Sequence, residues 1–379
     1  MQQEIPTHNT YYSKELFTRE LFEMYFLLGI RKFAISMVGI FLPLYFLIEL
    51  HYSLNAVIAF YMINVIAVVA FLWPAMKIVK IYGTKHSIIY SIPTLIIGLL
   101  LAVMLPNYPF LFIPISILLG IDLALFWMGF HTDTAIYSKS RALGKESAII
   151  WIVNVFGMVL GPIVGGVILK YLGFSVLFFT VSIILIIAII PLLFSKETYA
   201  KTEFDWKYFF HDGHKKYFFG YFAQGIRSIT TIIFWPLFIF GIIGGYFYLG
   251  VYGSVATLLV ALFGYSIGQI SDKMNKGIII KIAGIADGML WVIKIFITTI
   301  LDVFAFGTIG GITAIGIDIP LLAKSYKKAK NEKIAAFILF REFSIRCGQM
   351  FVLIVVLVIG NIKASFITSA LAGLLYLFF

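Results

Sequence analysis

Charged residues and cysteine are scarce in this chain. Only 12% of its 379 residues are Asp, Glu, Lys or Arg, about half the share of a soluble domain. The single cysteine, Cys347, excludes an internal disulfide and a cysteine-based metal cluster. The sequence also lacks a G-x-x-x-x-G-K-[ST] phosphate loop, an H-E-x-x-H pair and a G-x-S-x-G elbow. We therefore expect no enzyme, no ATP-driven pump, no metal and no cofactor.

Apolar residues make up 61% of the chain and occur in long, continuous runs. A helix crosses the hydrocarbon with about 20 such residues, and the runs do not alternate with period two as barrel strands do. We predict an all-α, polytopic membrane protein with twelve spans, at residues 22–48, 54–76, 86–105, 109–133, 146–169, 173–194, 216–240, 244–268, 277–299, 303–323, 333–360 and 363–379.

Positive charge is distributed unevenly between the loops. Of the 29 Lys and Arg residues, 21 fall in loops or termini on one side, and only Lys170 and Lys363 fall on the other. Cytoplasmic loops collect such residues, so both termini are predicted to be cytoplasmic in a plasma-membrane protein. The same bias explains the net charge of +11 without nucleic-acid binding. Residues 1–20 are polar, so the first span is expected to serve as its own insertion signal.

The chain divides into two similar halves. Its longest polar stretch predicts a six-helix bundle at 1–200, a cytoplasmic linker at 201–215 and a second six-helix bundle at 216–379. Tyr25–Arg31 in the first span resembles Tyr221–Arg227 in the seventh. A parallel repeat of six helices is a plan that builds a central site between the two bundles.

The fifth span carries closely spaced small residues and a proline. They form a strip on one helix face, so that a neighbouring backbone can approach closely, and they are Gly157, Gly161, Pro162, Gly165 and Gly166. The segment resembles the G-x-x-x-G-P-x-x-G-G signature of antiporters in the major facilitator superfamily. A generic close-packed helix pair is the alternative.

Two loops resemble another pattern of that family, G-x-x-x-D-R-x-G-R-R, in which the acid helps to lock the halves together. After the eighth span, Asp272 and Lys273 match it. After the second span, Lys80 stands where the family has its acid. The resemblance implies a gate at Asp272 and puts the corresponding lock of the first half in doubt; in either loop a solvated basic turn is the alternative.

The resemblance implies a secondary transporter working by alternating access, and we expect proton-coupled export of a small organic solute by a monomer in the lipid bilayer. An anion, organic-acid or organophosphate exchanger that uses Arg31 and Arg227 is an alternative. A sensor or receptor on the same fold, without transport, is another. The solute itself is beyond the sequence.

Charges inside spans are costly and are commonly functional or paired. Arg31 and Arg227 occupy equivalent places in the first and seventh spans and could bind an anionic solute with their planar donors. Alternatively, each pairs with the aspartate of its own half, Asp133 or Asp318, as a clamp or gate. Both interpretations stay open at this stage.

Two further residues are candidates for proton coupling. Asp122 lies near the middle of the fourth span without an obvious partner, and a lone buried carboxyl group can exchange protons. Pairing with Arg31 is the alternative. His131 can titrate near neutrality or cap the inner mouth.

Other polar and aromatic residues complete the prediction. Trp127, Gln224 and Trp235 are candidate solute contacts on helices expected to line the cavity, although packing is an equally simple role for the aromatic side chains. Arg341 and Glu342 are predicted to belong to the inner gate. Asp287 and Lys294, on the peripheral ninth span, are assigned a structural role.

Overall fold

A computed structural model describes residues 19–137, 143–194, 197–200, 208, 212–273 and 275–379. The elements formed by these residues are all helical, and each of the twelve predicted spans coincides with a helix or a run of consecutive helices. The prediction of an all-α polytopic fold is confirmed.

The first six spans are α2 (Arg19–Gly39) with α3 (Leu42–Leu44) and the π-helical turn η1 (Tyr45–Glu49); α4 (Leu54–Ile81); α5 (Thr84–Met104); the 3₁₀ turn η2 (Pro109–Leu111) with α6 (Phe112–Tyr137); α7 (Leu143–Tyr171); and α8 (Gly173–Ile189) with η3 (Ile190–Phe194). The last six are η5 (Asp212–His214) with α9 (Lys215–Ile229), the π-helical turn η6 (Thr230–Phe234) and α10 (Trp235–Ile243); α11 (Tyr246–Lys273); α12 (Lys276–Lys294); α13 (Ile300–Lys330); α14 (Ile334–Ile359); and α15 (Lys363–Leu375) with η7 (Tyr376–Phe378).

Within the described residues, nine helical segments are long and apolar enough to cross a membrane. Two shorter apolar segments, Val155–Tyr171 and Lys363–Phe378, belong to the fifth and twelfth spans. The remaining span is α12, whose polarity comes from Lys276, Lys281, Asp287 and Lys294. The main boundary errors lie in the ninth and tenth spans, because α12 ends at Lys294 while α13 begins at Ile300 and runs to Lys330.

The helix ends follow local chemistry. The side chain of Ser53 accepts a hydrogen bond from the Ala56 amide at the start of α4. Thr299 and Asp302 form a reciprocal capping box at the start of α13. Gly360 ends α14 with a φ of 71°, a conformation that glycine adopts without steric cost.

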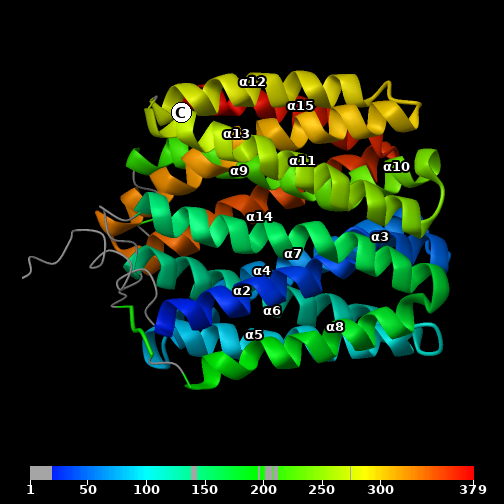
Figure 1. The fold of residues 1–379 in the computed structure, drawn as a ribbon, viewed down its shortest axis with the longest axis horizontal. Coiled ribbons are helices and arrows are strands. Elements are labelled where there is room, and N and C mark those ends of the chain that lie inside the picture. The colour runs from blue at the N-terminus through cyan, green and yellow to red at the C-terminus, as the bar shows by residue number, and fades with distance from the viewer. Residues whose placement is uncertain (1–18, 138–142, 195–196, 201–207, 209–211, 274) are drawn as a thin grey trace, which may run out of the picture.

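Figure 1 shows the helices running side by side along the long axis, with α2–α8 in one half of the molecule and α9–α15 in the other. Helices α7 and α14 lie at the boundary between the two groups. The C-terminus lies at one end of the helices, the left end in this view.

The small residues of α7 lie against two helices. A methyl group at Gly165 would come within 2.2 Å of the Met37 carbonyl oxygen of α2. One at Gly166 would lie 3.2 Å from the Gly250 Cα of α11. Because α11 belongs to the second half, the fifth span joins the halves through backbone contact that larger side chains would prevent.

Both the first and the seventh span are interrupted next to a proline. Pro43 opens α3 and is followed by η1, whereas η6 precedes Pro236, which opens α10. A proline lacks the amide hydrogen of a regular turn, and a π turn takes up one extra residue. The parts of each span before and after the interruption can therefore point in different directions.

Candidate functional site

The first charged pair joins α2 to α6 in the first half. Nη2 of Arg31 donates to both oxygens of Asp122, at 2.8 and 2.9 Å. The two residues are 1% and 2% exposed, and the guanidinium carbon lies 3.9 Å from the centroid of the Phe126 ring. Nε and Nη1 of Arg31 are buried without a hydrogen-bond partner. The pair is buried, and three of the five guanidinium N–H donors have no hydrogen-bond partner.

This arrangement corrects two expectations. Asp122 does not lack a partner, because it is buried against Arg31, and this pairing is the alternative that the sequence left open. The acid expected to pair with Arg31, Asp133, instead accepts a hydrogen bond from Thr84 Oγ1 at 2.6 Å. Asp133 lies eleven residues after Asp122 on α6, hence about 16 Å further along the helix. The side chain of Arg31 on α2 therefore reaches Asp122 and not Asp133.

The second pair joins α9 to α13 in the second half. Nη2 of Arg227 donates to Oδ1 of Asp318, as expected. Gln224 Nε2 donates to the same oxygen at 3.0 Å. The Asp318 side chain is 41% exposed, and Nε of Arg227 is buried without a partner. This pair is therefore more accessible than that of Arg31.

A polar junction connects the two halves between α6, α13 and α14. Nδ1 of His131 lies 2.8 Å from the hydroxyl of Tyr326. Its Nε2 lies 3.8 Å from Oε1 of Glu342. The His131 ring also stacks on Trp127, with centroids 5.0 Å apart. His131 of the first half thus contacts two residues of the second.

Glu342 is held in place by arginines of its own helix, α14. Oε1 accepts from Arg341 Nη1, and Oε2 accepts from Arg346 Nη2 at 3.2 Å. Arg346 also donates to Gln349 Oε1 at 2.7 Å. The predicted Arg341–Glu342 contact is present, and Arg346 joins it because residues four apart lie on one helix face.

Lys294, for which a structural role on the peripheral ninth span was predicted, is a buried cation. Its Nζ lies 4.0 Å from the Trp291 ring centroid and 4.7 Å from that of Trp235. Lys294 is 5% exposed, and a methyl group at Gly310 of α13 would lie 2.5 Å from Nζ. Asp287 accepts instead from Thr313 Oγ1 and Trp291 Nε1. The sequence feature that could have indicated this position is Gly310, because a residue without a side chain leaves room for the Lys294 ammonium.

Trp235 and Trp127 are thus both cation neighbours. Trp235 faces Lys294, and its indole nitrogen donates to Tyr252 Oη at 2.8 Å. Trp127 has the Lys32 ammonium 5.1 Å from its centroid. Their contacts are aromatic and electrostatic, and whether either touches a solute stays a prediction.

The residues of the two loops that resemble the gate pattern are placed only in part. The side chains of Asp272 and Lys273, at the end of α11, lie outside the described residues. Lys80 is exposed in the last turn of α4. Glu332 binds Lys328, Tyr208 and His214, and Glu342 binds two arginines of its own helix.

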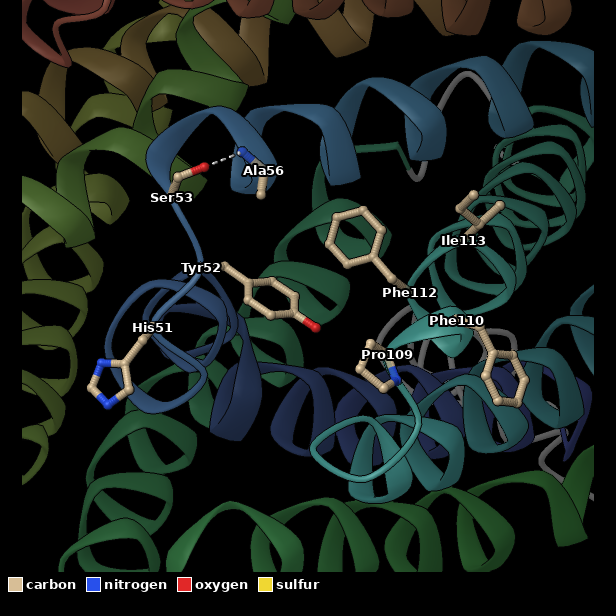
Figure 2. Close-up of a pocket in the computed structure, with 8 residues that line it drawn as sticks. All are labelled: His51, Tyr52, Ser53, Ala56, Pro109, Phe110, Phe112 and Ile113. Carbon is tan, nitrogen blue, oxygen red and sulfur yellow. Dashed lines mark hydrogen bonds between the residues drawn. The ribbon is translucent and has the colours of Figure 1, made fainter.

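A pocket of about 450 Å³ lies away from all these groups. It is formed where η1 leads into α4 and where η2 leads into α6, by His51, Tyr52, Ser53, Ala56, Pro109, Phe110, Phe112 and Ile113. Figure 2 shows the Tyr52 hydroxyl pointing into the space between these segments, whereas the His51 ring points away. None of the predicted site residues lines it. Among the described side chains, no group of three or more His, Cys, Asp or Glu residues is arranged to hold a metal ion.

Comparisons with known proteins place these features in a wider context. The family model described as Major Facilitator Superfamily matches residues 24–345. A comparison with curated proteins finds no match.

Several solved structures share the fold at low sequence identity. A POT family transporter in complex with a thioalcohol-conjugated peptide has a TM-score of 0.74 and 13% identity, over 95% of this chain and 94% of that one. A POT family transporter in complex with 5-aminolevulinic acid has a TM-score of 0.71 and 14% identity, with the same coverage. FucP, a major facilitator transporter in the outward conformation, has a TM-score of 0.66 and 14% identity, over 94% and 97%. These likenesses concern the fold alone.

Proposed function

Because this chain belongs to the Major Facilitator Superfamily and is a multi-pass membrane transporter, we propose that it exports a small organic solute in exchange for protons. Residues 1–200 and 216–379 form the two units that rock about a central site, joined by a linker at 201–215. The protein acts as a monomer in the plasma membrane with both termini in the cytoplasm.

The observation that carries the proposal is the buried Arg31–Asp122 pair. A proton bound to Asp122 neutralises its carboxylate and removes the attraction that holds Arg31. The guanidinium then becomes available to another acceptor, because a buried charge without a partner is costly. Proton binding and solute binding thereby become linked at one site.

The pair of Arg227 and Asp318 supplies the facing half of this site. Its carboxylate is the more accessible of the two, and Gln224 adds a polar group beside it. The antiporter-like small residues of α7, which lie against both α2 and α11, support export as the direction. They let the first half move against the second as a packed unit.

The test uses the purified protein in proteoliposomes. Counterflow against a panel of drugs, organic acids and sugars identifies a solute, and an imposed proton gradient then drives its accumulation. Asp122→Asn should retain counterflow and lose gradient-driven accumulation. Asp302→Asn, which changes an acid in the capping box of α13, serves as the matched control and should keep both. Gradient-driven accumulation by Asp122→Asn refutes the proposed coupling residue.

A second candidate, exchange of organic anions or phosphate esters, is favoured by the unused donors of both arginines. In that case counterflow of a phosphate ester or organic acid is independent of the proton gradient. Arg31→Lys, which loses the planar fork, should then abolish exchange, whereas Asp122→Asn should not. Absence of counterflow for every solute class would instead favour a sensor without transport.

A further inference from the structure

Lys32, in the first span, is a cation without a counter-charge among the described residues. Its ammonium lies 5.1 Å from the centroid of the Trp127 ring, and the charged neighbour that acts on it is Arg31, which is also positive. Arg31 is itself paired with Asp122. No acceptor in the described part of the chain binds Nζ of Lys32. A charge inside a span is costly, and one without a partner is commonly functional.

The internal repeat indicates that helix packing does not require this cation. The segment Tyr25–Arg31 corresponds to Tyr221–Arg227 of the second half, so Ser228 stands at the position of Lys32. Oγ of Ser228 accepts a hydrogen bond from Gln349 Nε2 at 3.1 Å. The second half therefore forms the equivalent helix with a neutral, hydrogen-bonded side chain at this position.

Lys32 lies on a side of α2 that faces open space. The backbone of Phe33 lies against α7, and Arg31 reaches α6. Lys32 is about 100° from each of these two residues around the helix. A methyl group added at Gly39, two turns further along the same side, would meet no atom within 4 Å. Lys32 and Trp127 are both half-buried, so a solute can reach the ammonium and the ring.

The Trp127 ring leads from Lys32 to the polar junction between the halves. Trp127 stacks on the ring of His131, with centroids 5.0 Å apart. His131 in turn lies 2.8 Å from the Tyr326 hydroxyl and 3.8 Å from Oε1 of Glu342, which both belong to the second half. The open side of α2 is therefore continuous with the boundary between the halves.

Positive charge exceeds negative charge at this junction. Arg341, Lys32 and Arg346 all act electrostatically on the His131 ring. Glu342 is the acid that binds both arginines. Three cations and one acid leave two positive charges without compensation among the described residues. Nε of each arginine is also buried without a hydrogen-bond partner. An anion at this place would balance the charge and accept from the unused donors.

We propose that Lys32, Arg341 and Arg346 form an anion-binding site in which Trp127 receives an apolar ring of the ligand, so that the solute is an organic anion with a carboxylate or phosphate group. Lys32 supplies three donors on a flexible stem, and the arginines supply their Nε–H groups. The inference rests on the proposed function in one respect, because it takes the bound anion to be the exported solute. Arg31, the partner of the proposed coupling residue, is the neighbour of Lys32 in the chain.

The experiment measures anion-dependent stability of the purified full-length protein in lipid nanodiscs. Sodium chloride is replaced at constant ionic strength by phenyl phosphate or by inorganic phosphate, and benzyl alcohol serves as a ring without charge. A ligand that binds the native state raises its stability with concentration, so the melting temperatures yield a Kd. The variants are Lys32→Met, Lys32→Arg and Trp127→Leu. Lys294→Met is the matched control, because Lys294 is also a cation over a tryptophan ring but lies near Asp287 in the second half.

Phenyl phosphate should stabilise the parent more than inorganic phosphate does, and benzyl alcohol should not stabilise it. Lys32→Met should raise the Kd of phenyl phosphate by about ten- to a hundredfold, the range for a hydrogen bond to a charged group. Lys32→Arg and Lys294→Met should retain binding. Without ligand, Lys32→Met should be at least as stable as the parent, because it removes an uncompensated charge.

Trp127→Leu gives a second measure that does not depend on Lys32. It should raise the Kd of phenyl phosphate and leave that of inorganic phosphate unchanged, because only the first ligand has a ring. Absence of stabilisation by both phosphates relative to chloride overturns the proposal. An equal Kd in Lys32→Met and the parent also overturns it and leaves Lys32 as a structural neighbour of Trp127.

The binding measurement needs no proton gradient, so it separates this inference from the proposed function. Loss of phenyl phosphate binding in Lys32→Met supports the anion site even if Asp122→Asn keeps gradient-driven accumulation. With an identified solute, counterflow should be lost in Lys32→Met and kept in Lys294→Met. Counterflow of an uncharged solute at the parent rate in Lys32→Met overturns the assignment of an anionic solute.

Discussion

A single nitrogen of Arg31, Nη2, donates to both oxygens of Asp122, while its Nε and Nη1 are buried without partners. The usual two-pronged contact of a guanidinium with a carboxylate uses two nitrogens. Here both carboxylate oxygens contact only one of the three guanidinium nitrogens. The pair is thus an ion pair in which the cation keeps donors for a second acceptor.

Removal of one charge from this pair should be more damaging than removal of both. Arg31→Met alone leaves a buried carboxylate and should cost about 3–5 kcal/mol of unfolding free energy, and Asp122→Leu alone should cost a similar amount. The double variant Arg31→Met/Asp122→Leu should recover most of the loss, because neither charge remains. Equilibrium unfolding in mixed micelles measures all three. If the losses simply add in the double variant, the two side chains are not coupled.

The contact of His131 with Tyr326 should contribute to closure between the halves. His131→Phe keeps a ring to stack on Trp127 but removes the hydrogen bond, whereas Tyr326→Phe removes only the hydroxyl. We expect a coupling energy of about 0.5–1.5 kcal/mol in the double-mutant cycle. The same cycle with Tyr252→Phe in place of Tyr326→Phe should show none, since Tyr252 bonds to Trp235. Zero coupling for the first cycle contradicts the junction.

The small residues of α7 should be intolerant of a single methyl group. Gly165→Ala brings a Cβ to 2.2 Å from a backbone oxygen, which cannot move aside as a side chain can. We expect a loss of about 1–3 kcal/mol in unfolding free energy. Gly241→Ala in α10 is a matched control, because its Cβ meets nothing within 4 Å, and it should stay within about 0.5 kcal/mol of the parent. Equal effects of the two changes would show that the α7 contact is loose.

The Glu332 contact should weaken only in acid. Burial raises the pKa of Glu332, but hydrogen bonds from Lys328, Tyr208 and His214, together with the His214 charge, lower it overall from its ordinary value of 4.5. A lowered folded-state pKa gives stability that is present above pH 4.5 and lost as the pH falls through the folded value. The contribution of Glu332 to the unfolding free energy should therefore stay constant from pH 7 down to pH 4.5 and decrease as the pH falls further, measured by equilibrium unfolding across this range. In Glu332→Gln this dependence should be reduced.

The twelve spans were predictable because the features that identify a span are local in the sequence. Continuous apolar runs and the loop charges identify the helices and their connections without knowledge of the neighbours. The errors concern relations between helices. Asp122 and Asp133 lie on the same helix, and only the three-dimensional position of α2 decides which of them meets Arg31. The boundaries of the two units and the orientation in the membrane stay predictions.

The surroundings of Lys294 likewise could not be predicted from the sequence. Its position on the ninth span suggested a peripheral role, yet the side chain is buried against Trp235 and Trp291. Room for its ammonium comes from Gly310, on a different helix. The contact of Glu197 with α5 was equally unpredictable, because its partners are backbone amides of Lys85 and His86 together with the His86 ring, and every residue except proline has such an amide.

The interruptions of the first and seventh spans are not placed alike relative to the two arginines. Pro43 follows Arg31 by twelve positions, whereas Pro236 follows Arg227 by nine. At 1.5 Å per residue, the proline of the second half lies about 4.5 Å closer to its arginine along the helix. A rigid molecule that contacted both guanidinium groups would therefore reach Pro236 before Pro43 and would lie tilted between the two halves. The two halves repeat in sequence, but they do not offer the same shape to a cargo.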